Sequence, residues 1–224
     1  MVHLYRGAER PVFGHEAILT RPHLAAHIGA VAAIWTIIEE SWGHILADAL
    51  DAEAKTGVAM YLALTGATSQ GAILQEAVKM HLPESIQQQV TDARKNEKGH
   101  SKDRNRIVHG RWGIVPSDDR YLVLGERDWL PKAIAHSRDV QNNPHRYTIL
   151  TPPTHPDMEM RLYSKKDFEQ IEGRLMDHYH NLGKIIQQID VWRQERRLLA
   201  LMLLNPTGGE RGLLHSPGTA PEES

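Results

Sequence analysis

Two long stretches of the chain place apolar residues at every third or fourth position, the spacing that lines one face of a helix. In the first stretch they are Leu24, Ile28, Val31, Trp35, Ile38 and Trp42. In the second they are Phe168, Ile171, Leu175, Leu182, Ile185, Ile189 and Trp192, with His178 on the same face. Both stretches are too long for strands, so the fold must be built on at least two long helices. We expect the first helix to be central, because Ile34 and Ile37 widen its apolar face.

Shorter helical patterns fill the chain between these two. Two of them are predicted over Ala54 to Leu64 and Ser69 to Leu82. Pro83 then fits the first turn of a further helix, where its missing N–H costs nothing. Ser164 and Asp167 have the spacing of a capping box, which predicts the start of the last helix, and that helix extends to about residue 204. We interpret its leucine-rich end, residues 198–204, as core or as a dimer contact.

The segment from Gly113 to Tyr163 has a different character. Pro-Ser-Asp-Asp at 116–119 separates two apolar runs and predicts a hairpin. A third strand is expected over 147–150, and 158–162 alternates with period two, with Met158, Met160 and Leu162 on one face. A short helix is expected over 128–136. The fold class that follows is mainly all-α, a helical bundle of about four to five helices with a small β-hairpin insertion.

The same patterns predict the domain organisation. We expect an N-terminal arm over 1–20, a helical domain over 21–204 that contains the insertion at 113–163, and a disordered tail over 205–224. The first twenty residues contain charges where a signal peptide needs an apolar region. The longest run without Lys, Arg, Asp or Glu, from Pro22 to Ile38, is short for a membrane span. We therefore expect a soluble, cytoplasmic protein that does not contact the membrane.

Composition narrows the chemistry. The 224 residues include no cysteine, which excludes disulfides, thiolate zinc sites, thiol nucleophiles and iron–sulfur clusters. Some of the fourteen histidines pair at helical spacing, as His23 and His27 do, but no third ligand stands nearby in the sequence. We therefore expect no metal and no cofactor. The net charge of −2 means that any affinity for nucleic acid must come from a local patch.

The helix after Pro83 has a face that turns polar. The face begins with the apolar residues Ile86, Val90 and Ala93. At the same helical spacing it continues with the ionisable residues Glu97, His100 and Arg104, and then Ile107. Burying unpaired charge there costs several kcal/mol, so the polar groups must be paired, hydrated or functional. From Asp92 to Arg111 the chain has seven Lys and Arg against three Asp and Glu, a local anion-attracting patch.

The end of this helix reads Arg104-Asn105-Arg106-Ile107-Val108-His109-Gly110. An Arg, an adjacent polar residue, a few intervening residues and a His resemble the signature of the HEPN superfamily, helical proteins that include metal-independent ribonucleases, toxins and defence nucleases. The Arg-polar-His spacing occurs at six places in the chain, but only this one combines Asn, an apolar pair before His and a following Gly in a late helix. The resemblance implies cleavage of RNA to a 2′,3′-cyclic phosphate and a 5′-hydroxyl.

The residue types suit that chemistry. His109 can serve as base or acid, and Arg104 can offer two N–H groups to a phosphate. Asn105, four residues before His109, can orient the imidazole. The further phosphate-binding candidates are Arg106, His100, Lys102 and Arg111. Five positions of an ideal helix rotate through about 140°, so Arg104 and His109 of one chain are not expected to lie side by side.

A homodimer with both motifs facing one cleft, which the resemblance implies, would bring these groups together. For a HEPN-like protein, a further expected partner is an antitoxin or a regulatory protein. The sequence does not reveal the identity of that partner. Neither a Walker loop nor a Gly-x-Ser-x-Gly motif is present.

Three other interpretations stay open. A non-catalytic HEPN-like module would bind RNA, nucleotide or a protein partner. An unrelated helical protein would use His109 and Gly110 as a helix C-terminus, with glycine in the left-handed conformation. Trp112 can stack on a base or, more simply, anchor the hairpin to the bundle.

Overall fold

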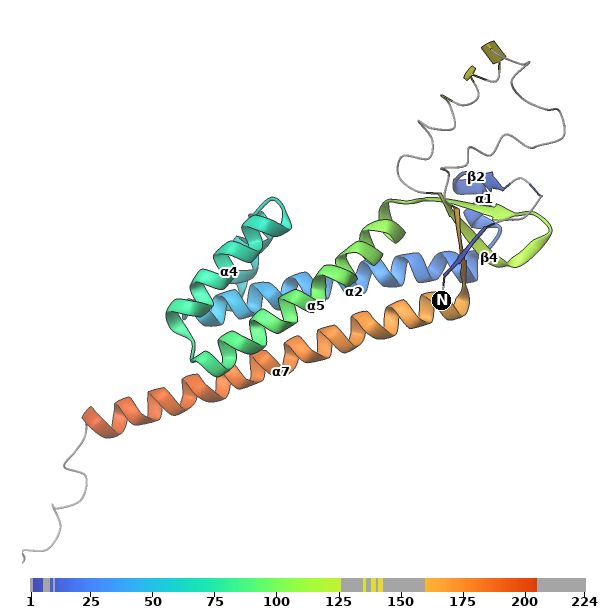
Figure 1. The fold of residues 1–224 in the computed structure, drawn as a ribbon. Helices are drawn as coiled ribbons and strands as arrows, with labels where there is room; N and C mark the ends of the chain where they lie inside the picture. The colour runs from blue at the N-terminus through green and yellow to red at the C-terminus, as the bar shows by residue number, and fades with distance from the viewer. Residues whose placement is uncertain are drawn as a thin grey trace, which may run out of the picture.

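The computed structural model describes residues 2–5, 9, 11–125 and 160–204, together with 135, 138, 139, 141 and 142. The chain is mainly helical with one small antiparallel sheet, which confirms the predicted class at that level. The expected helix at 128–136 (residue 135 apart), the expected strand at 147–150, Met158 and the tail at 205–224 lie outside the described residues. Three long helices run side by side (Figure 1), namely α2 (Pro22–Ala49), α5 (Glu84–His109) and α7 (Lys165–Leu204).

Helix α2 is central, as its pattern predicted. It packs against α5, α7 and the two shorter helices α3 (Ala54–Ala63) and α4 (Ala67–His81). Of the predicted apolar positions, Leu24, Val31, Trp35, Ile38 and Trp42 are buried, whereas Ile28, Ile34 and Ile37 are half-buried. By length and composition α2 could also cross a membrane, a test that the core helix of a soluble protein passes as well.

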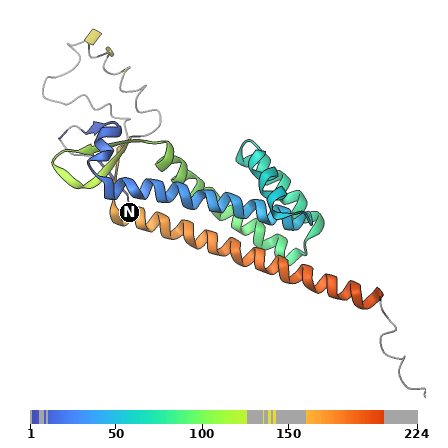
Figure 2. The same cartoon turned by 180° about the vertical axis from the view of Figure 1, so that it is seen from behind.

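Helix α7 begins at the predicted capping box. Ser164 Oγ accepts a hydrogen bond from the Asp167 N–H (3.3 Å), and Asp167 Oδ2 accepts one from the Ser164 N–H (3.0 Å). The predicted apolar face is buried from Phe168 to Ile189, and Trp192 is half-buried. Figure 2 shows α7 projecting beyond the other helices. Its leucines and methionine at 198–204 are 57–80% exposed, so this end is not part of the core, and a contact with a second copy stays a prediction.

The predicted hairpin belongs to a larger sheet. Strands β3 (Arg111–Val115) and β4 (Asp118–Gly125) form the hairpin, and Val115 pairs with Asp118 around Pro116 and Ser117. Strand β5 (Met160–Ser164) pairs with β4. The N-terminal residues add β1 (His3–Leu4), β2 (Val12–Phe13) and the short helix α1 (His15–Leu19). The order is β1-β5-β4-β3-β2, so residues of the expected arm and the expected insertion form one antiparallel sheet.

The sheet closes one end of the helical bundle. Successive strand residues point to opposite faces. One face joins the helical core through Trp112, Ile114, Leu122, Leu124 and Tyr163. The other carries a second apolar cluster around Val115, Val123 and Met160. Ile107, near the C-terminal end of α5, belongs to the same core cluster as these residues of the sheet.

Candidate functional site

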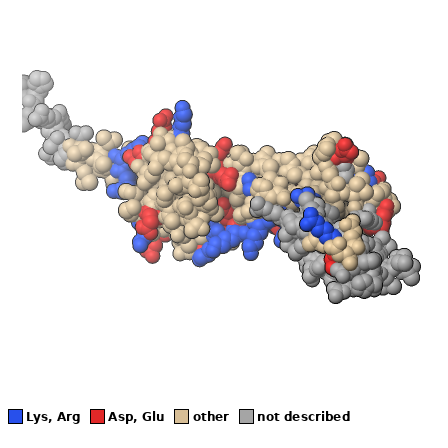
Figure 3. Space-filling model, turned by 90° about the horizontal axis from the view of Figure 1, so that it is seen from above, with Lys and Arg blue, Asp and Glu red and all other residues tan. Residues whose placement is uncertain are grey.

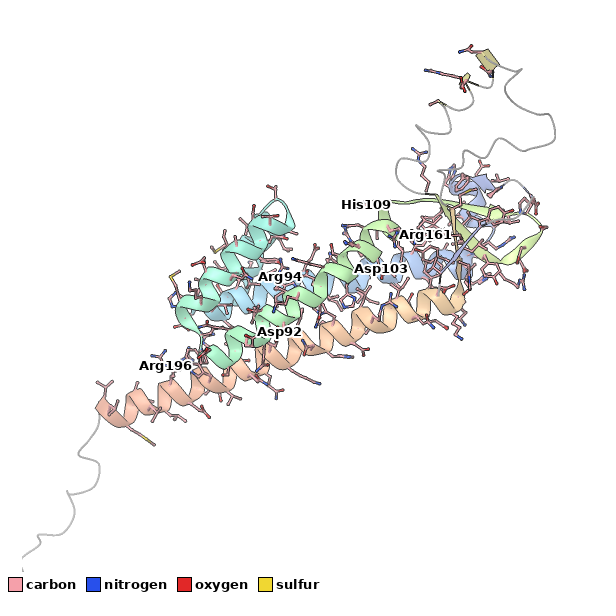
Figure 4. The ribbon with its side chains drawn as sticks, in the orientation of Figure 1. Asp92, Arg94, Asp103, His109, Arg161 and Arg196 are labelled. Carbon is pink, nitrogen blue, oxygen red and sulfur yellow. The ribbon has the colours of Figure 1, made fainter. Side chains whose placement is uncertain are left out.

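Helix α5 ends at His109, where the chain turns into β3 (Figure 4). The Trp112 indole N–H donates a hydrogen bond to the Ile107 carbonyl oxygen, at 2.8 Å. The Trp112 ring packs against Tyr163 and Phe168 and is only 6% exposed. Trp112 thus anchors the hairpin to the bundle, and it is too buried to stack on a base. The last turn of α5 is fixed by this contact.

Gly110 is required by close packing. Its φ of −74° is not left-handed, so the interpretation of this residue as a left-handed helix cap was wrong. A Cβ added at Gly110 would lie 2.2 Å from Leu124 Cδ1 and 2.4 Å from the Arg106 carbonyl oxygen. Only glycine lets α5 pass into β3 this close to β4. His109, the residue before Gly110, is exposed at this junction.

The three motif residues expected to carry the chemistry lie together. Arg104 Nη1 is 2.8 Å from Asn105 Oδ1 and 3.4 Å from His109 Nε2. The second contact is a hydrogen bond when Nε2 is unprotonated and accepts. Our expectation that Arg104 and His109 of one chain lie apart was therefore wrong. The helical rotation fixes the directions of the Cβ atoms, but the long Arg104 side chain reaches around the helix to the imidazole.

Arg104 is half-buried between α5 and α2. Its Cζ lies 5.8 Å from the centroid of the Trp35 ring, a cation–π arrangement. Its Nε is buried without a hydrogen-bond partner, and within the described part of the chain Nη2 makes no hydrogen bond. Trp35 fits the sequence pattern of a core residue, so nothing in the sequence pointed to its contact with the motif.

Arg106 belongs to a separate network between α5, α7 and β5. Asp103 accepts hydrogen bonds from Arg174 (2.8 Å) and, at the distance limit, from Arg106 (3.5 Å). In Figure 4 Asp103 and His109 stand on different turns of α5. Burial raises the pKa of the Tyr163 phenol, and the nearby Arg106 guanidinium opposes that rise. Arg106 is thus bound within the protein and less available to phosphate than the sequence indicated.

The other candidates separate into two groups. His100 lies nine residues before His109, about 13 Å along the helix axis, and its ring centroid is 5.2 Å from that of His178 on α7. Burial, together with Arg174, lowers the His100 pKa. Lys102 and Arg111 are exposed on either side of His109 in sequence. The structure thus gathers Arg104, Asn105 and His109, and turns His100 towards α7.

Glu97 is paired, which is one of the three outcomes expected for a charged group on this face. It forms an ion pair with Arg94. Arg94 Nη1 also lies 3.3 Å from the Tyr61 hydroxyl, and its Cζ lies 5.2 Å from the Trp42 ring centroid. Burial raises the Glu97 pKa, and Arg94 opposes that rise. This cluster links α3 to α5 and lies away from the motif.

Among the residues that the structure describes, no three His, Asp or Glu side chains gather as metal ligands would. His27 instead contacts Glu172, with 2.7 Å between Nδ1 and Oε1, and stacks on Phe168. Comparison with known protein families, curated proteins and solved structures finds no match for this chain.

Proposed function

We propose that this chain is a HEPN-like, metal-independent endoribonuclease that cleaves RNA by attack of the 2′-hydroxyl on the adjacent phosphate. The observation that supports the proposal is the contact of the Arg104 guanidinium with both His109 and Asn105 at the end of α5. It places an imidazole, which can accept or donate a proton, beside a guanidinium, which can offer two N–H groups to a phosphate. Such a pair can hold a phosphate and move a proton beside it.

In the proposed reaction the 2′-oxygen bonds to phosphorus and the bond from phosphorus to the 5′-oxygen breaks. His109 Nε2 takes the 2′-hydroxyl proton or supplies the proton that the 5′-oxygen needs. Arg104 turns its free N–H groups to the non-bridging oxygens, and Asn105 holds the guanidinium in place. Lys102 and Arg111 contact neighbouring phosphates. The products are a 2′,3′-cyclic phosphate and a 5′-hydroxyl.

The reaction needs both a base and an acid, and one motif provides a single imidazole. A second copy of the chain is the proposed source of the other, so the working form is a homodimer whose motifs share a cleft. The proposal includes a cytoplasmic role as a toxin or in defence, with the activity inhibited by an antitoxin or a regulatory protein.

A second candidate is a non-catalytic HEPN-like module that binds RNA, nucleotide or a protein partner. It is favoured by the half-burial of Arg104 and by the two contacts that already occupy Nη1. A phosphate must replace at least part of this arrangement before chemistry can begin.

Incubation of the purified protein with mixed RNA in EDTA separates the two candidates. Cleavage by the wild type, lost in His109→Ala and Arg104→Ala and retained in His180→Ala, supports the ribonuclease. His180 is exposed on α7 and serves as the matched control. Analysis of the product ends must show a 2′,3′-cyclic phosphate. Absence of cleavage by wild type, or equal cleavage by His109→Ala, refutes the ribonuclease proposal.

A further inference from the structure

The exposed face of α5 carries three lysines before the motif. Lys95, Lys98 and Lys102 are all exposed. At about 100° per residue they lie with His109 inside an arc of about 60°, and the distance from Lys95 to His109 is about 21 Å along the axis. We call Lys95, Lys98 and Lys102 the lysine track. His109, to which the motif assigns proton transfer, lies about 10 Å beyond Lys102 along the same side of the helix.

Two of the three acidic residues in this part of α5 are paired with arginines and not with the lysine track. Glu97 is buried with Arg94, and Asp103 binds Arg174 and Arg106. Asp92 pairs with Lys95 at 3.2 Å, but both side chains are more than half exposed, so this pair is weak and easily exchanged. Figure 3 shows Lys and Arg side chains gathered along one edge in the middle of the molecule. The lysine track therefore presents largely uncompensated positive charge.

Gly99 lies between Lys98 and Lys102 along the axis, about 40° outside the arc of the lysine track on the side of Lys95. It is exposed, inside the helix, and a Cβ added to it meets nothing within 4 Å. Glycine disfavours a helix relative to alanine, and here no packing contact requires it. Its missing side chain gives closer access to the helix backbone beside the lysine track.

We propose that the lysine track binds the sugar–phosphate backbone of single-stranded RNA and leads it to His109. This inference rests on the proposed function and adds the form of the substrate and its path. The lysine track is one helix wide, and the path from Lys95 through the track to His109 is about 21 Å long, which matches a single strand. Shape recognition of an RNA duplex needs contacts that extend over about 16 base pairs. Phosphates bind the lysines, and a sugar or phosphate fits over Gly99.

The first test measures binding of a fluorescent 2′-O-methyl oligonucleotide of about twelve nucleotides, within the usual range of single-strand sites. This probe lacks the attacking hydroxyl and cannot be cleaved. We expect the triple variant Lys95→Gln, Lys98→Gln, Lys102→Gln to lose at least tenfold in affinity at low salt. The slope of log affinity against log salt should shrink by about 2, at about 0.7 per phosphate contact. The control triple, Lys55→Gln, Lys79→Gln, Lys166→Gln, removes the same charge from exposed lysines on α3, α4 and α7 and should bind as wild type does.

The second test uses opposite effects on stability and binding. Gly99→Ala should raise Tm by about 2–4 °C, because alanine favours the helix, and should weaken probe binding several-fold. Gly183→Ala is the matched control, an exposed glycine inside α7 that likewise meets nothing within 4 Å. It should raise Tm without changing binding. Unchanged binding by Gly99→Ala overturns the role given to Gly99.

The outcomes distinguish this inference from the proposed function. Wild type that binds the probe through the lysine track but cleaves no RNA refutes the ribonuclease and supports the track. Wild type that cleaves RNA, with equal probe binding by both triple variants, refutes the track alone. Absence of probe binding by wild type, tighter binding of the duplex form, or equal displacement of the probe by polyglutamate of the same charge also overturns the inference.

Discussion

His178 should make the fold less stable in mild acid. It is 5% exposed on α7, with its ring centroid 6.1 Å from Trp42 and 5.2 Å from His100. Its Nε2 is buried without a hydrogen-bond partner. Burial, reinforced by the positive charges of His100 and Arg94, lowers the His178 pKa to about 4.

The sign and size of the effect follow from this shift. As the pH falls below the ordinary histidine pKa of 6.5, the unfolded chain takes up the proton before the folded protein does. The free energy of unfolding therefore decreases on acidification, by about 1.4 kcal/mol at pH 5.5 and about 2 kcal/mol at pH 5.0. The loss from this residue reaches at most about 3.4 kcal/mol below pH 4, and it is absent above pH 7.

Urea unfolding followed by circular dichroism measures the effect at pH 7.5 and pH 5.0. His178→Leu keeps an apolar side chain of similar size and removes the titrating group, so it should lose about 2 kcal/mol less than wild type between the two pH values. His180→Gln removes an exposed imidazole two residues away and should follow wild type. An equal loss in wild type and His178→Leu refutes the argument from burial.

Two other variants test packing that the sequence did not reveal. Gly110→Ala forces a Cβ against the Arg106 carbonyl and Leu124, so we expect a loss of about 1–3 kcal/mol in urea unfolding and slower RNA cleavage; wild-type stability would show that the junction relaxes freely. Arg94→Met leaves the Glu97 carboxylate buried without its cation, and we expect a loss of about 3–5 kcal/mol at neutral pH. The added substitution Glu97→Gln should restore part of that loss, and a double variant no more stable than Arg94→Met would count against the pairing argument.

The long helices could be predicted because their signals are local and repeated. The apolar face of α2 and that of α7 each span many turns, and the Ser164–Asp167 capping box marks where α7 begins. Predicted ends differ from observed ones by a residue or two, as at α4, and Pro83 stands just before α5 instead of in its first turn. Such shifts are expected where terminal turns are stabilised by only a few contacts.

The sheet was predicted only in part because its order depends on contacts between distant segments. The turn at Pro116 and Ser117 marks the hairpin, but β1 and β2 are two residues long and too short to show an alternating pattern. They form only because β5 and β3 offer open edges to the N-terminal residues. Likewise, the need for glycine at 110 arises from the nearness of β4, which no local pattern records.

The polar residues on the mostly apolar face of α5 are each accommodated in a different way. Glu97 is neutralised by Arg94, and His100 packs against His178. Arg104 is only partly compensated: Nη1 contacts Asn105 and His109, but Nε is buried without a partner, and an unsatisfied buried donor costs about 1–3 kcal/mol. An apolar side chain over Trp35 would satisfy the packing without that cost. Under the proposed function, the reason for an arginine at this position is phosphate binding beside His109, and the orphaned Nε is a cost of that role.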